Sequence, residues 1–191
     1  MPDLTLDPQT TALVVIDLQK GIVGMPTVPH PAADVLTRST QLAEAFRAKQ
    51  GLVVLVHVDT GPKGELFPRT ITDIVRPPMA LPPGWSDIVS ELGPKPGDVV
   101  VTKHQPSAFF GTDLDIHLRR RGITTIVLCG IATNIGVEST ARTGYEHGYN
   151  LVFASDAMTA RDADLHTMAV AKYFPTIGRV RTTAEILSAL A

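Results

Sequence analysis

Short apolar runs alternate with longer amphipathic stretches along the whole chain. Runs rich in Val, Ile and Leu with few polar positions are typical of buried parallel strands, and they occupy residues 12–16, 52–58, 99–101, 126–129, 151–154 and 177–180. The stretches between them carry apolar residues at three- and four-residue spacing. This spacing predicts helices at 32–49, from about 112, at 135–146, at 163–173 and at 183–190, the last with Thr183 as its N-cap.

The alternation predicts an α/β fold. We expect a three-layer α-β-α doubly wound, Rossmann-like sandwich with a mainly parallel sheet of about six strands. The chain has 191 residues, enough for one sizeable core, and no repeat or linker divides it. A single domain spanning residues 1–191 is therefore expected.

Two segments rich in Gly and Pro interrupt the pattern. Residues 21–31 read as a loop, whereas residues 59–85 form an unusually long connection, which in a compact domain is functional or disordered. We interpret 59–85 as a lid over the sheet edge, with Phe67, Met79 and Trp85 as candidate pocket walls. Within it, Arg69 and Arg76 are candidate ligands for a substrate carboxylate, and the alternative that both are solvated surface residues stays open.

Charge and cysteine content narrow the possible partners and compartment. Lys and Arg number 17 against 19 Asp and Glu, a net charge of −2, which gives no electrostatic case for nucleic acid or an anionic membrane. No apolar run approaches the length of a membrane helix. The single cysteine, Cys129, excludes an intrachain disulfide and lies in an apolar run, as an inert core thiol does. With no apolar N-terminal targeting segment, a cytoplasmic location is expected.

Motifs for nucleotides and metals are absent from the sequence. Neither GxGxxG nor GxxxxGK[ST] occurs, and no histidines share the spacing of a helical zinc site. His57 with Asp59 is the nearest approach to a chelating pair, for which we favour a structural or pocket-polar role. The sequence therefore predicts no cofactor and no metal.

Three strand ends carry the candidate chemistry. Asp17 and Lys103 each end an apolar run, and the fourth run leads through Gly130 into a helix that begins near Thr133 and Asn134, which are N-cap residue types. A helix N-terminus at the carboxyl edge of a sheet suits an oxyanion, and a carboxylate beside an ammonium is a tuned acid–base pair. Glycine inside a helix costs about 1 kcal/mol relative to alanine, so Gly136 in the first turn requires a reason.

The ordered motifs VVIDLQ, TKHQPSAFFGTDL and GIATNIGVESTA resemble those of the isochorismatase-like (cysteine) hydrolase family, and the resemblance runs from residue 11 to residue 190. It looks closest to the YecD-type subgroup. It implies a catalytic set of Asp17, Lys103 and, at the position of the family's cysteine, Gly136, so that the nucleophile is missing. It further implies a cis peptide between Ile131 and Ala132 that aims the N–H groups of Ala132 and Gly136 at the substrate.

The resemblance also extends to substrate contacts and assembly. It assigns substrate binding to Gln19, Ser107, Phe109 and Phe110, and it implies a homo-oligomer, either a dimer or a tetramer. Family members that lack the cysteine cleave a vinyl ether rather than an amide. In that reaction the aspartate protonates a methylene carbon, and hydrolysis releases pyruvate.

The first hypothesis is therefore a hydrolase of a small carboxylated, isochorismate-like metabolite, with Asp17 as general acid, Lys103 orienting it and Gly136 supplying room. A second is an amide or ester hydrolase in which Asp17 activates water, or in which Ser107 or Ser139 is a substitute nucleophile. A third, from another class, is a catalytically silent homologue that binds a metabolite or a partner.

Overall fold

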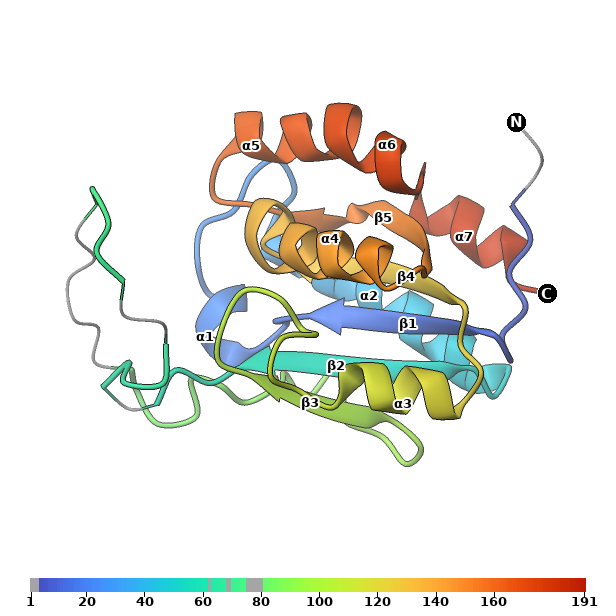
Figure 1. The fold of residues 1–191 in the computed structure, drawn as a ribbon, viewed down its shortest axis with the longest axis horizontal. Coiled ribbons are helices and arrows are strands. Elements are labelled where there is room, and N and C mark those ends of the chain that lie inside the picture. The colour runs from blue at the N-terminus through green and yellow to red at the C-terminus, as the bar shows by residue number, and fades with distance from the viewer. Residues whose placement is uncertain (1–3, 62, 68–69, 75–80) are drawn as a thin grey trace.

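Six parallel strands form the centre of the computed structural model, which describes residues 4–61, 63–67, 70–74 and 81–191 (Figure 1). Their order across the sheet is β3-β2-β1-β4-β5-β6. The strands are β1 (Thr11–Ile16), β2 (Leu52–Val58), β3 (Val99–Lys103), β4 (Thr125–Ile131), β5 (Asn150–Thr159) and β6 (Arg179–Arg181). The predicted α/β fold with a six-stranded parallel sheet is confirmed.

Helices cover both faces of the sheet (Figure 1). One face carries α2 (Ala32–Ala48), α7 (Thr183–Ala189) and the short α1 (Lys20–Val23). The other carries α3 (Leu114–Arg120), the π-turn η1 (Thr133–Val137) with α4 (Glu138–Glu146), and the continuous α5 (Ala163–Met168), η2 (Ala169–Tyr173) and α6 (Phe174–Ile177). Among the described residues, no helix has both the length and the apolarity that crossing a membrane requires.

Strand β1 shows how the sequence builds these layers. Val14 and Ile16 point into the core under α3 and α4, whereas Leu13 and Val15 point into the core under α2 and α7. Successive side chains on a strand face opposite sides, so a strand covered on both sides must be apolar at every position. All six residues of β1 are buried.

Several element boundaries differ from the sequence prediction. Strand β5 extends to Thr159 because its register with β4 shifts, so that Leu128 pairs with Phe153 but Gly130 pairs with Met158. The preceding helical segment runs to Ile177, which moves β6 to residues 179–181.

The N-cap predicted for the last helix was wrong by one residue. Thr182 is the N-cap, and it forms a capping box in which its hydroxyl accepts from the Glu185 N–H and the Glu185 carboxylate accepts from the Thr182 N–H. The hydroxyl and N–H of Thr183 both donate to Asp156 Oδ1 instead, at 2.8 and 2.7 Å. A glutamate three residues after Thr182 was the signal for this cap in the sequence.

The predicted lid does not cover the sheet edge in the described part of residues 59–85. These residues run outward beyond the carboxyl edge (Figure 1), where Ile71 and Ile74 have exposed fractions of 105% and 78%. Both ends of the segment are bonded to the rest of the fold. At its start the Asp59 N–H donates to Lys103 O at 2.9 Å, and at its end the Trp85 carbonyl accepts from the Gly21 N–H at 3.0 Å. The glycines and prolines interrupt any continuous apolar face that could pack on the sheet. Met79, Arg69 and Arg76 lie outside the described residues.

Gly130 of β4 pairs with Ile16, the last residue of β1. Gly130 has φ +118°, and a Cβ added to it would lie 2.0 Å from the carbonyl oxygen of Ile16. No side chain fits there, and the positive φ is unfavourable for any other residue. Glycine at 130 thus lets the two central strands end side by side.

We therefore expect Gly130→Ala to lower the free energy of unfolding by about 2–5 kcal/mol, because it adds both overpacking and a left-handed backbone penalty. Gly148→Ala is the matched control, since Gly148 has φ +82° with no atom within 4 Å of an added Cβ. It should lose only about 1–2 kcal/mol. Urea denaturation measures both values, and equal losses would contradict the close-approach explanation.

Candidate active site

Asp17 is the first residue after β1, and its backbone is left-handed, with φ +54°. Aspartate tolerates this conformation better than most residues. Ile16 already points into the core under α3 and α4, and the left-handed turn directs the Asp17 carboxylate to that same side. The Asp17 N–H donates to Val56 O at 2.9 Å, which holds the turn against β2.

Lys103 ends β3, two strands away from β1, and it reaches across β2 to the carboxylate. Its Nζ lies 2.8 Å from Asp17 Oδ2, and it also donates to the carbonyl oxygens of Gln105 and Pro106 at 3.2 and 3.0 Å. An ammonium group has three donors, so all the donors of Lys103 are engaged. Asp17 and Lys103 thus lie side by side, as the sequence predicted.

The two carboxylate oxygens of Asp17 have different surroundings. Oδ2 is paired with Lys103, whereas Oδ1 is buried and has no hydrogen-bond partner among the described residues. Burial raises the pKa of Asp17 from 3.8 to about 6, against the opposing effects of the Lys103 ammonium and the His57 ring. The desolvation cost therefore exceeds the attraction between the paired charges, and a proton on Asp17 belongs on Oδ1.

Gly136 lies in η1 directly against this ion pair. A Cβ at position 136 would be 2.8 Å from Ile16 Cγ2 and 3.0 Å from Asp17 Oδ2. An added Cβ would thus press on Ile16 and on the ion pair, and these contacts do not support the expectation that Gly136 supplies room. The glycine instead allows the first helical turn to rest on the paired charges.

The peptide bond between Ile131 and Ala132 is cis, the geometry that the family resemblance implied. Ala132 is the N-cap of η1, without a side-chain cap, and its carbonyl accepts the N–H groups of Ile135 and Val137 at 3.1 and 3.2 Å. Thr133 was therefore not the cap that the sequence predicted. The expected aim of the Ala132 and Gly136 N–H groups at a substrate stays a prediction.

Gln19 is completely occupied by the protein backbone. Its Oε1 accepts from the Val58 N–H at 2.8 Å, and its Nε2 donates to the carbonyls of Val58 and Trp85 at 3.0 and 3.2 Å. The side chain is fully buried. This placement does not support the predicted substrate contact, and Gln19 instead fastens β1 to the ends of β2 and of segment 59–85.

Phe109 and Phe110, both expected in the pocket wall, have different surroundings. Phe109 is 7% exposed and stacks on His147 and Tyr149, at the end of α4 farthest from Gly136, and this placement does not support its predicted substrate contact. A large aromatic ring gains more from this core than from a polar site. Phe110 is 72% exposed.

Neither Ser107 nor Ser139 contacts a general base among the described residues. Ser107 Oγ donates to Thr143 Oγ1 at 3.1 Å and accepts from the Phe109 N–H, and neither partner is a base. The Ser139 carbonyl accepts from the Thr143 hydroxyl. The hydroxyl of Ser139 forms no hydrogen bond with any described residue. A nucleophilic serine needs an adjacent general base, so these contacts give the substitute-nucleophile alternative no support.

Both ring nitrogens of His57 are hydrogen-bonded to the protein. His57 Nδ1 lies 2.9 Å from Ser86 O and Nε2 lies 2.8 Å from Thr102 Oγ1, which ties β2 to β3 and to the end of segment 59–85. Within the described ranges, no three His, Cys, Asp or Glu side chains are grouped to hold a metal ion. Burial raises the pKa of the Cys129 thiol to about 12, so it carries no thiolate at neutral pH.

One residue that sequence reasoning did not single out is His166, which lies 5% exposed with its Nδ1 2.8 Å from Thr133 Oγ1. A lone histidine 30 residues beyond the turn gave no spacing signal that could have identified it.

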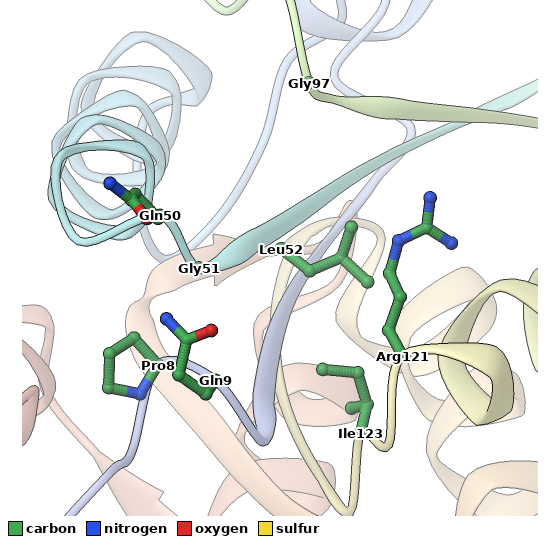
Figure 2. A pocket seen from close by; sticks show the side chains of 8 residues that line it. All are labelled: Pro8, Gln9, Gln50, Gly51, Leu52, Gly97, Arg121 and Ile123. Atoms are coloured by element: carbon green, nitrogen blue, oxygen red, sulfur yellow. The ribbon is translucent and has the colours of Figure 1, made fainter.

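A groove of about 340 Å³ lies at the opposite, amino edge of the sheet (Figure 2). Leu52 and Ile123, which begin or precede strands, belong to its lining together with the polar side chains of Gln9, Gln50 and Arg121. None of its lining residues is an acid, a histidine or a nucleophile. We therefore place the candidate chemistry at Asp17, where a carboxyl group is buried and perturbed, rather than in this groove.

Comparison with known proteins identifies the family to which the chain belongs. The family model described as the isochorismatase domain matches residues 11–185. The chain is 47% identical to the uncharacterized isochorismatase family protein YecD of Escherichia coli O157:H7, over 98% of this chain and 100% of the relative. It is 34% identical to the ureidoacrylate amidohydrolase RutB of Methylobacterium radiotolerans, over 98% and 82%. An isochorismatase family protein from Burkholderia thailandensis has a solved structure with a TM-score of 0.92 and 51% identity, covering 98% of both chains.

Removing the positive charge of Lys103 should reveal how much the burial of the Asp17 carboxylate lowers the free energy of unfolding. Because the folded-state pKa of Asp17, about 6, lies above its ordinary 3.8, the fold favours the protonated form, and this contribution to stability is lost as pH rises through 6. Lys103→Met removes the attraction that opposes burial. It should raise that pKa further and lower the free energy of unfolding by about 3–5 kcal/mol at pH 8, with a smaller loss at pH 5.

Chemical denaturation at the two pH values measures this difference, and carbon-13 NMR of the Asp17 carboxyl follows its pKa. Lys20→Met is the control, because the Lys20–Asp87 pair is 2.9 Å apart but 60% and 55% exposed. Its loss should stay below about 1 kcal/mol at both pH values. A pH-independent loss in Lys103→Met would mean that Asp17 is not the group destabilised.

Proposed function

The chain belongs to the isochorismatase family, and on that premise we propose that it is a hydrolase of a small carboxylated, isochorismate-like metabolite in which Asp17 is the general acid. The observation that carries the proposal is the asymmetry of the Asp17 carboxyl group. One oxygen is held by Lys103. The other is buried with no hydrogen-bond partner in the part of the chain that the structure describes, and the pKa of the group is raised to about 6. A carboxyl group in this state can give up a proton near neutral pH.

The chemistry follows from the two oxygens. Asp17 Oδ1 transfers its proton to the methylene carbon of a substrate vinyl ether, and the adjacent carbon becomes an oxocarbenium ion. Water adds to that carbon, and its excess proton returns to Asp17. The resulting hemiketal collapses to pyruvate and an alcohol. Lys103 keeps Oδ2 fixed and stabilises the carboxylate that forms when the proton leaves.

Gly136 has a defined part in this proposal. Glycine has no side chain with which to attack a substrate, so the reaction proceeds without a covalent intermediate on residue 136. A Cβ added there would lie 2.8 Å from Ile16 Cγ2 and 3.0 Å from Asp17 Oδ2. The buried, un-ionised thiol of Cys129 does not replace it. Acid catalysis by Asp17 needs no nucleophilic side chain, since the attacking group is water.

An amide or ester hydrolase in which the Asp17 carboxylate activates water is the second candidate. It is favoured by the 34% identity to a relative named as a ureidoacrylate amidohydrolase. The same carboxyl group would then act in its ionised form, as a general base toward water. The two candidates therefore require opposite protonation states of one residue.

The proposal includes the setting of the enzyme. A cytoplasmic, single-domain hydrolase fits a chain with near-balanced charge and one buried cysteine. Its assembly into a dimer or a tetramer is proposed from the family resemblance alone. Its partner is the small-molecule substrate, with neither nucleic acid nor membrane involved.

We expect purified protein to release pyruvate from isochorismate, detected with a coupled lactate dehydrogenase assay. Asp17→Asn should lower kcat by about 100- to 10,000-fold, because the proton donor is lost. Cys129→Ala is the control and should retain full turnover. Pyruvate release that survives Asp17→Asn would exclude the general-acid role. Ammonia or acid release from amides or esters in place of pyruvate would favour the second candidate, and saturable binding without any turnover would favour a silent homologue.

The pH profile separates acid from base catalysis. The protonated fraction of Asp17 falls tenfold per pH unit above a pKa of about 6. With Asp17 as general acid, kcat/KM should therefore fall as pH rises above 6. With Asp17 as general base, kcat/KM should instead fall as pH drops below 6. Steady-state rates between pH 4.5 and pH 8.5 distinguish the two slopes.

A further inference from the structure

A buried imidazole is hydrogen-bonded to the turn that carries Gly136. His166 on α5 is 5% exposed, and its Nδ1 lies 2.8 Å from Oγ1 of Thr133, which is itself fully buried. Thr133 follows Ala132 directly and is the first residue of η1, three residues before Gly136. The hydrogen bond therefore holds a side chain that belongs to the turn itself rather than to a neighbouring loop.

The other end of the turn is fixed to the same part of the fold. Ile131, which precedes Ala132, pairs with Thr159 at the end of β5. The Thr159 hydroxyl donates to His30 O at 2.8 Å and accepts from the His30 N–H at 3.3 Å. The His30 ring meets the His166 ring edge-on, with centroids 5.7 Å apart. Residues on both sides of Ala132 are thus held by β5, α5 and one short loop.

The hydrogen bond between His166 and Thr133 is between neutral groups. Burial, with a smaller effect from the His30 ring, lowers the pKa of His166 to about 4. A neutral imidazole has one donor and one acceptor nitrogen, and a hydroxyl can serve either. An uncharged partner holds the turn without adding a positive charge behind the Asp17–Lys103 pair.

We propose that His166 is a positioning residue for this site, whose hydrogen bond to Thr133 fixes the backbone between Ala132 and Gly136 in the orientation that the reaction uses. The catalytic half of this inference rests on the proposed function. The structural half concerns only the turn. His166 does not touch the reacting atoms, and it acts through Thr133.

Two pairs of variants test the hydrogen bond without removing bulk. His166→Asn keeps a polar atom where Nδ1 lies, whereas His166→Gln moves it to the position of Nε2. Thr133→Ser keeps the hydroxyl, and Thr133→Val removes it at nearly constant volume. The Gly136 amide resonance in ¹H–¹⁵N spectra reports the turn, kcat and KM report the reaction, and thermal unfolding reports stability.

We expect Thr133→Val and His166→Gln to shift the Gly136 resonance and to lower kcat about 10- to 100-fold with KM nearly unchanged. The Thr133→Ser and His166→Asn variants should remain close to the natural protein in both. The Thr133→Val/His166→Gln double variant should be no worse than either single change, because both remove one interaction.

Three results would overturn the inference. An unmoved Gly136 resonance in both disruptive variants would remove the structural half. Loss of kcat in all four variants in proportion to lost thermal stability would mean a packing role only, and additive losses in the double variant would mean that the two residues act separately. Failure of the proposed function is distinguishable, because the natural protein would then lack turnover while the pattern of Gly136 shifts still decides whether His166 holds the turn.

Discussion

The burial of one ion pair, Asp17 with Lys103, determines the chemistry available to this molecule. The two residues come from strands that are not neighbours in the sheet, and Lys103 spans β2 to reach the carboxylate at 2.8 Å. Taking both charges out of water costs more than their attraction returns, so the pKa of Asp17 is raised rather than lowered. The carbonyls of Gln105 and Pro106 complete the shell of the ammonium, which leaves the imbalance on the carboxyl group.

The backbone conformation at Asp17, Gly130 and Gly136 allows the ion pair and the turn after β4 to lie in contact. Asp17 uses a left-handed conformation to turn its carboxylate toward Lys103, and Gly130 lets β4 end against the Ile16 carbonyl. Gly136 lets η1 lie on the pair itself, where any side chain would collide with Ile16. Glycine at position 136 lowers helix propensity, and its presence is explained by this close packing.

The support of the site comes from elements far apart in the sequence. Gln19 fastens β1 to β2 and to Trp85, and His57 connects β2 with β3 and Ser86. His166 holds the turn after β4 from α5. Gln19 and His166 in this way satisfy buried polar groups, which would otherwise oppose folding. Gln19, His57 and His166 thus bond to the protein itself, whereas one buried oxygen of Asp17 has no hydrogen-bond partner in the described part of the chain.

The sequence by itself determined the layered fold and the residues that end the central strands. Apolar runs and helical spacing follow from burial on one or two faces, which is a local property, and they identified all six strands in order. The ordered motifs likewise brought Asp17, Lys103 and Gly136 into one hypothesis. Element ends were less predictable, because the β5 register shift and the Thr182 cap depend on partners distant in the chain or on one competing residue.

Only the tertiary structure decided which side chains are free to act. Gln19 and Phe109 share the motifs of the site, yet Gln19 is consumed by backbone hydrogen bonds and Phe109 by the core near α4. His166 had no signal in the sequence, since its partner is brought to it by the packing of α5. Hydrogen bonding and desolvation depend on three-dimensional neighbours. These neighbours leave one Asp17 oxygen without a partner among the described residues and raise the pKa of its carboxyl group.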